Sequence, residues 1–180
     1  SAFALKKTST GAPVRWRTER VVLSLAPSLD EIVGGPEAVE ASAASWSGAG
    51  GGPELETVAG GEPAAVGLDG TNTVSFAAGG FPPAAGALAV TIVSYDERTG
   101  AILDADIVLN GEHRLVSFAG AKPVERRDDG DHEDARERAA ARPKLYDVTW
   151  VAAHEIGHAL GLSDEPGRSD ALMYPYVAPM

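Results

Sequence analysis

The 180-residue sequence contains no cysteine and no long apolar run. Without cysteine there can be no disulfide, no thiolate metal ligand and no cysteine nucleophile. No segment approaches the roughly 20 consecutive apolar residues that a membrane-spanning helix needs. The lack of cysteine does not fix the compartment, but it is compatible with an exported protein that meets varying redox conditions.

Basic residues are scarce relative to acidic ones, with 15 Lys and Arg against 26 Asp and Glu and a net charge of −11. This excess of negative charge disfavours nucleic acids and anionic membranes as partners, and weakly favours cations such as calcium. The glycine-rich stretches 48–52 and 79–86 are not followed by Gly-Lys-Ser/Thr, and no Gly-x-Ser-x-Gly occurs. Phosphate-binding loops and serine hydrolase chemistry are therefore disfavoured.

The length fits one domain, spanning residues 1–180, with a hydrophobic core of its own. Apolar alternation and β-branched residues predict strands at 14–25, 55–58, 72–76, 88–95 and 101–109. An alanine-rich helix is expected at 37–46, beginning near Pro36 and ending at Gly48, and a second helix after Asp147 as its N-cap. Strands with two helices and few βαβ alternations indicate an α+β domain.

Two segments are expected to lie outside regular structure. Residues 79–86 hold two prolines and three glycines, which favour a loop. Residues 117–143 are highly charged and poor in large apolar side chains, so we expect a solvated insertion with a short helix at its end.

The most informative residues are His154, Glu155, His158, Gly161 and Asp164. Two histidines four apart on a helix lie on one face, about 5–6 Å between Cβ atoms, which suits both imidazoles to one zinc ion. A glutamate directly after the first histidine is placed to take a proton from a zinc-bound water. Gly161 lets the helix stop, and Asp164 can then turn back as a third ligand.

The same helix has a separate apolar face. At about 100° per residue, five residues gather on the side away from the histidine pair: Val148, Ala152, Ile156, Ala159 and Leu160. One helix thus serves packing and chemistry together. The alternative is a chance His-x-x-x-His followed by an ordinary C-cap glycine and turn aspartate, and the coincidence of these offsets argues against it.

The motif His154-Glu155-x-x-His158-x-x-Gly161-x-x-Asp164, followed by Ala-Leu-Met-Tyr-Pro at 171–175, resembles the metzincin metallopeptidases. The second part resembles the Met-turn of the matrixins, although only residues 147–175 are specific. The resemblance implies a mixed, twisted sheet of about five strands with a backing helix and an active-site helix. It also implies one catalytic zinc ion and an apolar floor formed by Met173, for which ordinary core filling is the alternative.

Two departures from the family are visible. The usual third ligand is histidine, whereas this chain has Asp164, in which it is similar to the snapalysins, small bacterial metzincins. An anionic ligand should make the zinc a weaker Lewis acid and its water less acidic than the pKa of about 7 found with neutral ligands. Only five residues follow Pro175, so the family's closing C-terminal helix is expected to be missing or cut off.

The resemblance implies a secreted bacterial zinc endopeptidase whose signal peptide has been removed, acting on extended peptides that pair with the strand at 88–94. A plain core strand is the alternative for that segment. Trp150 is expected either to make the S1′ pocket shallow or to pack ordinarily. The expected substrate contacts are Trp150, Leu88, Val90, Ile92, Tyr174, Pro175 and Tyr176.

A rival interpretation comes from a different class: a catalytically weak or latent domain that binds zinc or peptide. The intact Glu155 argues against it. The first 15 or so residues are expected to be a pro-segment remnant or to lead into the first strand. Four carboxylates could bind calcium, but solvated turns are the favoured interpretation for them: Asp96, Glu97, Asp104 and Asp106. A second zinc ion at His113 or His132 is disfavoured.

Overall fold

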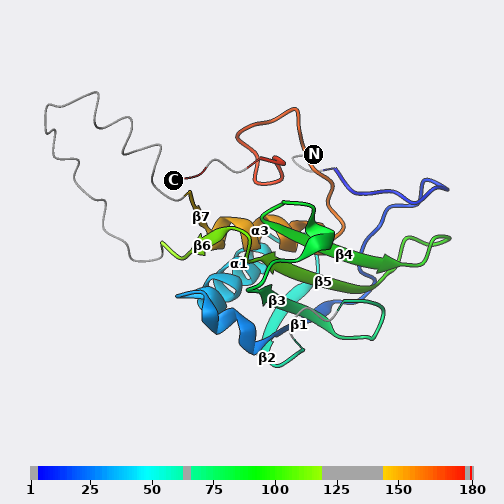
Figure 1. The fold of residues 1–180 in the computed structure, drawn as a ribbon. Coiled ribbons are helices and arrows are strands. Elements are labelled where there is room, and N and C mark those ends of the chain that lie inside the picture. Colours follow the sequence, from blue (N-terminus) through cyan, green and yellow to red (C-terminus); the bar gives the residue numbers. More distant parts are fainter. Residues whose placement is uncertain (1–3, 63–65, 119–143, 177–178, 180) are drawn as a thin grey trace, which may run out of the picture.

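The computed structural model describes residues 4–62, 66–118, 144–176 and 179. Its main element is a five-stranded sheet in the order β2-β1-β3-β5-β4 (Figure 1). The strands are β1 (Arg20–Leu25), β2 (Glu54–Ala59), β3 (Asn72–Ala77), β4 (Ala89–Tyr95) and β5 (Ile102–Asn110). The first four in this order run parallel, and β4 pairs antiparallel with β5 at one edge. This mixed sheet agrees with the expected architecture.

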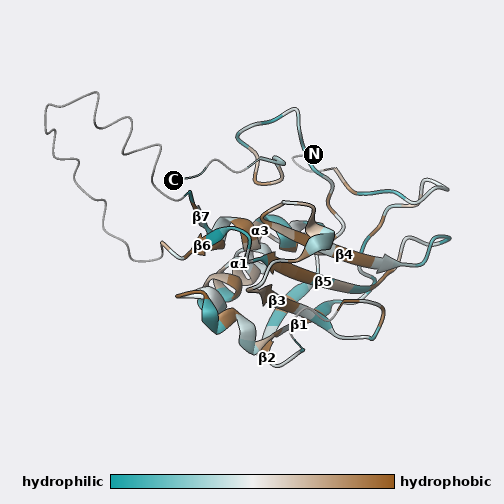
Figure 2. Ribbon diagram, in the orientation of Figure 1, coloured by the Kyte–Doolittle hydropathy of each residue, from teal (hydrophilic) through white to brown (hydrophobic). Residues whose placement is uncertain are grey.

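Two helices, α1 (Gly35–Ala49) and α3 (Val148–Ala159), pack against each other and share one core with the sheet. Sheet residues of this core alternate along their strands, so both helices cover the same face: Val21, Leu23, Leu25, Val74, Ala89, Ala105, Ile107 and Leu109. Figure 2 shows the hydrophobic character concentrated along β4 and β5. Because α3 lies against β4 and β5, its residues are held near an open sheet edge.

The expected α1 is confirmed, with Pro36 in its first turn, where the missing N–H is not needed. The apolar face expected on α3 is also confirmed, since Val148, Ala152, Ile156 and Ala159 are all buried. Asp147 is the N-cap, and its Oδ1 accepts a hydrogen bond of 2.9 Å from the Thr149 N–H.

Two expectations about elements were wrong in part, and two short strands were missed. The first strand begins at Arg20 instead of residue 14, because the segment before it leaves the sheet: Arg15 forms a bridge with Ala101. The 79–86 loop contains a short 3-10 turn, η2 (Pro82–Ala84). Prolines are tolerated in the first turn of such a helix, because the N–H that they lack has no partner there. The short parallel strands β6 (Arg114–Val116) and β7 (Leu145–Asp147) were not anticipated.

Asp104 and Asp106 were expected in solvated turns, and this was also wrong. They lie on β5, are only 1% and 2% exposed, and accept hydrogen bonds from backbone N–H groups of the loop before β3 and of Thr73 on β3. Their alternation on one face of the strand places both beneath that loop, whose N–H groups stabilise them. Asp96 does lie in a turn and accepts hydrogen bonds from Thr99.

The remaining elements include η1 (Pro27–Glu31), a 3-10 helix between β1 and α1. Residues 119–143, most of the expected charged insertion, lie outside the described residues, as does His132. No described helix combines the length and the apolar character required to cross a membrane.

Candidate metal centre and active-site cleft

The two histidines of α3 face each other one helical turn apart. Their Nε2 atoms are 3.0 Å apart, while the Nδ1 atoms contact backbone carbonyls, His154 with Leu172 at 2.8 Å and His158 with Leu162 at 2.9 Å. Because a carbonyl can only accept, each Nδ1 carries the proton and each Nε2 presents a lone pair. Two lone pairs therefore converge on one point, with both ring orientations fixed by backbone partners.

Asp164 reaches the same point from the segment after the helix. Its Oδ1 lies 3.5 Å from Nε2 of His154 and 3.4 Å from Nε2 of His158. The chain turns at Gly161, which has φ of +92°, and a Cβ there would overlap the carbonyl oxygen of Val14. Glycine is thus required at this position both by conformation and by space.

This donor set fits a zinc ion. Three acceptor atoms converge within 4.8 Å of one another. Tetrahedral ligands at about 2.0–2.1 Å from zinc would lie about 3.3–3.4 Å apart, close to the separations found here. Three acceptors facing one another without a donor are unfavourable unless a cation lies between them. His154, His158 and Asp164 are the only such group among the residues that the structure describes.

Met173 forms the floor under this group. Its side chain is fully buried, and its sulfur lies against Gly157 of α3, where a Cβ would overlap it. The preceding residue, Leu172, supplies the carbonyl that orients His154. The turn around Met173 therefore supports the metal ligands both by packing and by a hydrogen bond.

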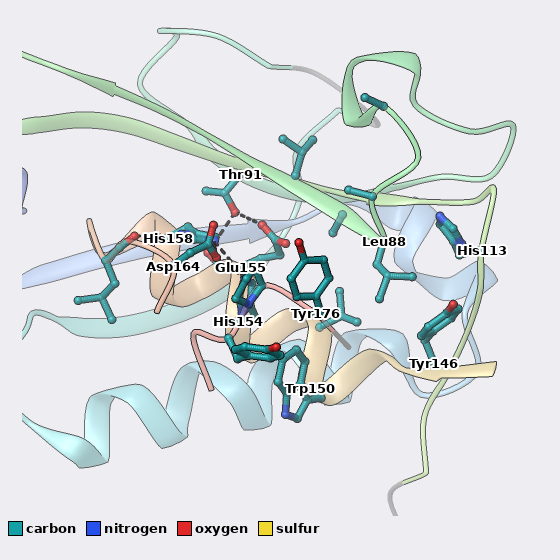
Figure 3. Close-up of a pocket in the computed structure, with 18 of the residues that line it drawn as sticks. Leu88, Thr91, His113, Tyr146, Trp150, His154, Glu155, His158, Asp164 and Tyr176 are labelled. Atoms are coloured by element: carbon teal, nitrogen blue, oxygen red, sulfur yellow. Dashed lines mark hydrogen bonds and ion pairs between the residues drawn. The ribbon is translucent and has the colours of Figure 1, made fainter. Parts of the chain in front are cut away.

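Glu155 lies beside the group and is 7% exposed. Its Oε2 accepts a hydrogen bond of 2.5 Å from the hydroxyl of Thr91. Figure 3 shows the Thr91 side chain directed from the edge strand β4 toward Glu155. Burial raises the pKa of Glu155, while the Thr91 hydrogen bond acts in the opposite direction. Thr91 was not anticipated. One feature of the sequence could have indicated Thr91. It is a polar residue in an otherwise apolar strand, and it shares the α3-facing side of that strand with Ala89, two positions before it.

A cleft of about 650 Å³ runs along β4 past the metal ligands and Glu155. Most of the expected substrate contacts line it: Trp150, Leu88, Val90, Tyr174, Pro175 and Tyr176. Trp150 also stacks on His154, with ring centroids 5.6 Å apart and planes at 16°. Lys6, His113 and Tyr146 line the cleft as well, and none of them was expected there.

Ile92 was expected to contact substrate but does not line the cleft. Ile92 pairs with Asp106 across β4 and β5, and directly opposed residues of an antiparallel pair share a face. Since Asp106 points under the loop before β3, Ile92 is directed to the side of the sheet away from α3. Val90, on the same face of β4 but nearer its start, does line the cleft.

Comparison with known protein families identifies the chain. The model of the matrixin family (Peptidase_M10) matches residues 84–180, from the end of η2 through β4, β5 and α3 with its two histidines to the end of the sequence. The chain belongs to the matrixin family. Membership implies a zinc metallopeptidase, a class that hydrolyses peptides. A search among curated proteins returned no match for this matrixin.

Proposed function

We propose that this matrixin is a secreted bacterial zinc endopeptidase that uses Asp164, in place of a third histidine, to complete its metal site. The observation that supports it best is the convergence of two Nε2 lone pairs and one carboxylate oxygen, with Glu155 beside them. A zinc ion held there would act as a Lewis acid and make water reactive near neutral pH.

In this proposal Glu155 is the general base and then the general acid. Its carboxylate takes a proton from the attacking water and passes it to the leaving amine of the peptide. Burial raises the pKa of Glu155, which makes its carboxylate a better base toward the attacking water. The backbone of β4 would bind the peptide, because an edge strand with β5 as its one described partner can add an extended chain.

The cleft supports an extended substrate. Its lining extends from the catalytic group to His113 and Tyr146 and also includes Lys6. Figure 3 shows Trp150 on the α3 side and Leu88 on the β4 side, so a substrate side chain would enter between a helix and a strand. The stacking on His154 holds the indole of Trp150 in place as one wall of the cleft. This position of the indole supports a shallow S1′ pocket.

The test is cleavage of casein or gelatin. We expect hydrolysis that a chelator abolishes and added zinc restores, and a Glu155→Gln variant that keeps zinc but loses activity by at least about 100-fold. Near-normal hydrolysis by Glu155→Gln would exclude the proposed base. Stoichiometric zinc without turnover in the wild-type protein would favour the weak or latent binding domain instead.

The third ligand and the location need separate measurements. We expect Asp164→Ala to lower the zinc content of purified protein, and a crystal structure with zinc to show the carboxylate in contact with the ion. Secretion is tested by detecting the protein in the culture medium of the bacterium that encodes it. Finding it only inside the cells would contradict that part of the proposal.

A further inference from the structure

We propose that Thr91 is a positioning residue for the general base, so that the edge strand of the sheet orients Glu155 through one side-chain hydroxyl. This inference rests on the proposed function and adds to it a residue outside the metal-binding motif. It begins from a contact between two segments 64 residues apart in the sequence.

The Thr91 hydroxyl has one proton and two neighbours that can accept it. The carboxylate Oε2 of Glu155 is 2.5 Å away and the backbone carbonyl of the same residue is 3.1 Å away. The shorter, charge-assisted bond is the stronger one, so the proton points to the carboxylate. No other side-chain hydrogen bond to this carboxylate is found among the described residues.

Thr91 is well held for this purpose. It lies within the β4 ladder, opposite Ile107 of β5, and its β-branched side chain restricts rotation about χ1. Glu155, in contrast, has three rotatable side-chain bonds and would sample other rotamers without an anchor. The bond engages Oε2 and leaves Oε1 to take the proton of water. Figure 3 shows the carboxylate held between the strand above it and α3 below it.

The strand that would bind the substrate backbone is thus the same strand that orients the base. Fixing both from β4 keeps the base in register with the scissile bond, and a misplacement of about 1 Å can cost roughly 100-fold in rate. Thr91 itself does not touch the reacting atoms in this scheme.

Two substitutions separate positioning from packing. Thr91→Val keeps the shape but removes the hydroxyl, and we expect kcat to fall about 10- to 100-fold with KM within about twofold. Thr91→Ser keeps the hydroxyl but removes the methyl group, and we expect kcat within about threefold of the wild type. Packing alone predicts the reverse order, with Ser more impaired than Val. Thr57→Val, on β2 at the opposite edge of the sheet, is the matched control and should leave kcat unchanged.

A metal-free readout completes the test. In the apo protein, Thr91→Val should lower the urea midpoint of unfolding more in the wild-type background than in a Glu155→Ala background, because the hydrogen-bond partner is absent there. The inference would be overturned if folded Thr91→Val had the kcat of the wild type. It would also be overturned if Thr91→Val lowered the urea midpoint equally in the wild-type and Glu155→Ala backgrounds. An inactive wild-type protein would instead refute the proposed function, and the unfolding comparison would still decide whether the Thr91 bond exists.

Discussion

Replacing Gly157 with alanine should destabilise this protein, although the same change usually stabilises a helix. Gly157 lies inside α3, and alanine in a helix interior is ordinarily favoured over glycine by about 0.5–1 kcal/mol. Here a Cβ would overlap the sulfur of Met173 and lie 3.1 Å from both Cε of Met173 and Cζ2 of Trp46. The methionine has to move, since the indole of Trp46 is fixed by a hydrogen bond of 2.8 Å to the Ala153 carbonyl.

The expected loss of unfolding free energy in Gly157→Ala follows from these two opposing effects. Overpacking a filled core costs about 1–3 kcal/mol, so subtracting the helix gain of about 0.5–1 kcal/mol leaves a net loss of up to about 2.5 kcal/mol. For a chain of this length each kcal/mol shifts Tm by roughly 2–4 °C, which gives a decrease of up to about 10 °C. Displacing Met173 also moves Leu172, whose carbonyl orients His154, so zinc affinity should fall about 10-fold or more.

Thermal unfolding and a chelator competition measure the two effects. The matched control is Gly48→Ala, a glycine of α1 around which a Cβ meets nothing within 4 Å. It should raise the unfolding free energy by up to about 1 kcal/mol and leave zinc affinity unchanged. If Gly157→Ala were as stable as Gly48→Ala and bound zinc normally, Met173 would not be the rigid floor described above.

Two further predictions concern the metal site, and a third concerns the buried carboxylate of Asp106 on β5. Asp164→Asn should weaken zinc binding, measured by chelator competition, because the amide oxygen carries no net charge; unchanged affinity would argue against Asp164 as a ligand. Lys6→Pro removes an N–H that donates to the carbonyl of Gly161 at 2.8 Å, and this variant should lower zinc affinity about 10-fold. Leu5→Pro is the control and should have a smaller effect, because the N–H of Leu5 makes no such backbone bond among the described residues. Asp106→Asn should cost about 1–3 kcal/mol in urea unfolding, because two backbone N–H groups each bind a different oxygen of the carboxylate; a neutral result would show that the loop before β3 does not depend on it.

The convergence of the three side chains at the candidate metal site was predictable because their arrangement is local. Helix geometry alone places His154 and His158 on one face, and a glycine in a left-handed conformation lets Asp164 return within six residues. The N-cap at Asp147 follows from local backbone chemistry in the same way. These features need no knowledge of the rest of the chain.

The features that were missed depend on pairing across long stretches of sequence. The facing of Ile92 is set by its partner on β5, and the burial of Asp104 depends on a loop more than 30 residues earlier. The partnership of Thr91 with Glu155 needs the position of β4 over α3. Alternation along a strand shows that two faces differ, but it does not say which face meets the helix.

The match to the matrixin family begins at residue 84, yet the metal site also depends on residues well before it. The carbonyl of Ala4 accepts a hydrogen bond from the N–H of Ser163, and the indole of Trp16 donates to the carbonyl of Ala159 at 2.9 Å. Both bonds hold the segment between the end of α3 and Asp164. The helix alone can present two imidazoles, but the turn that brings the carboxylate to them is fixed from outside. The approach of Asp164 to the two histidines is therefore a property of the whole fold, and we expect residues 84–180 by themselves to hold zinc less tightly than residues 1–180.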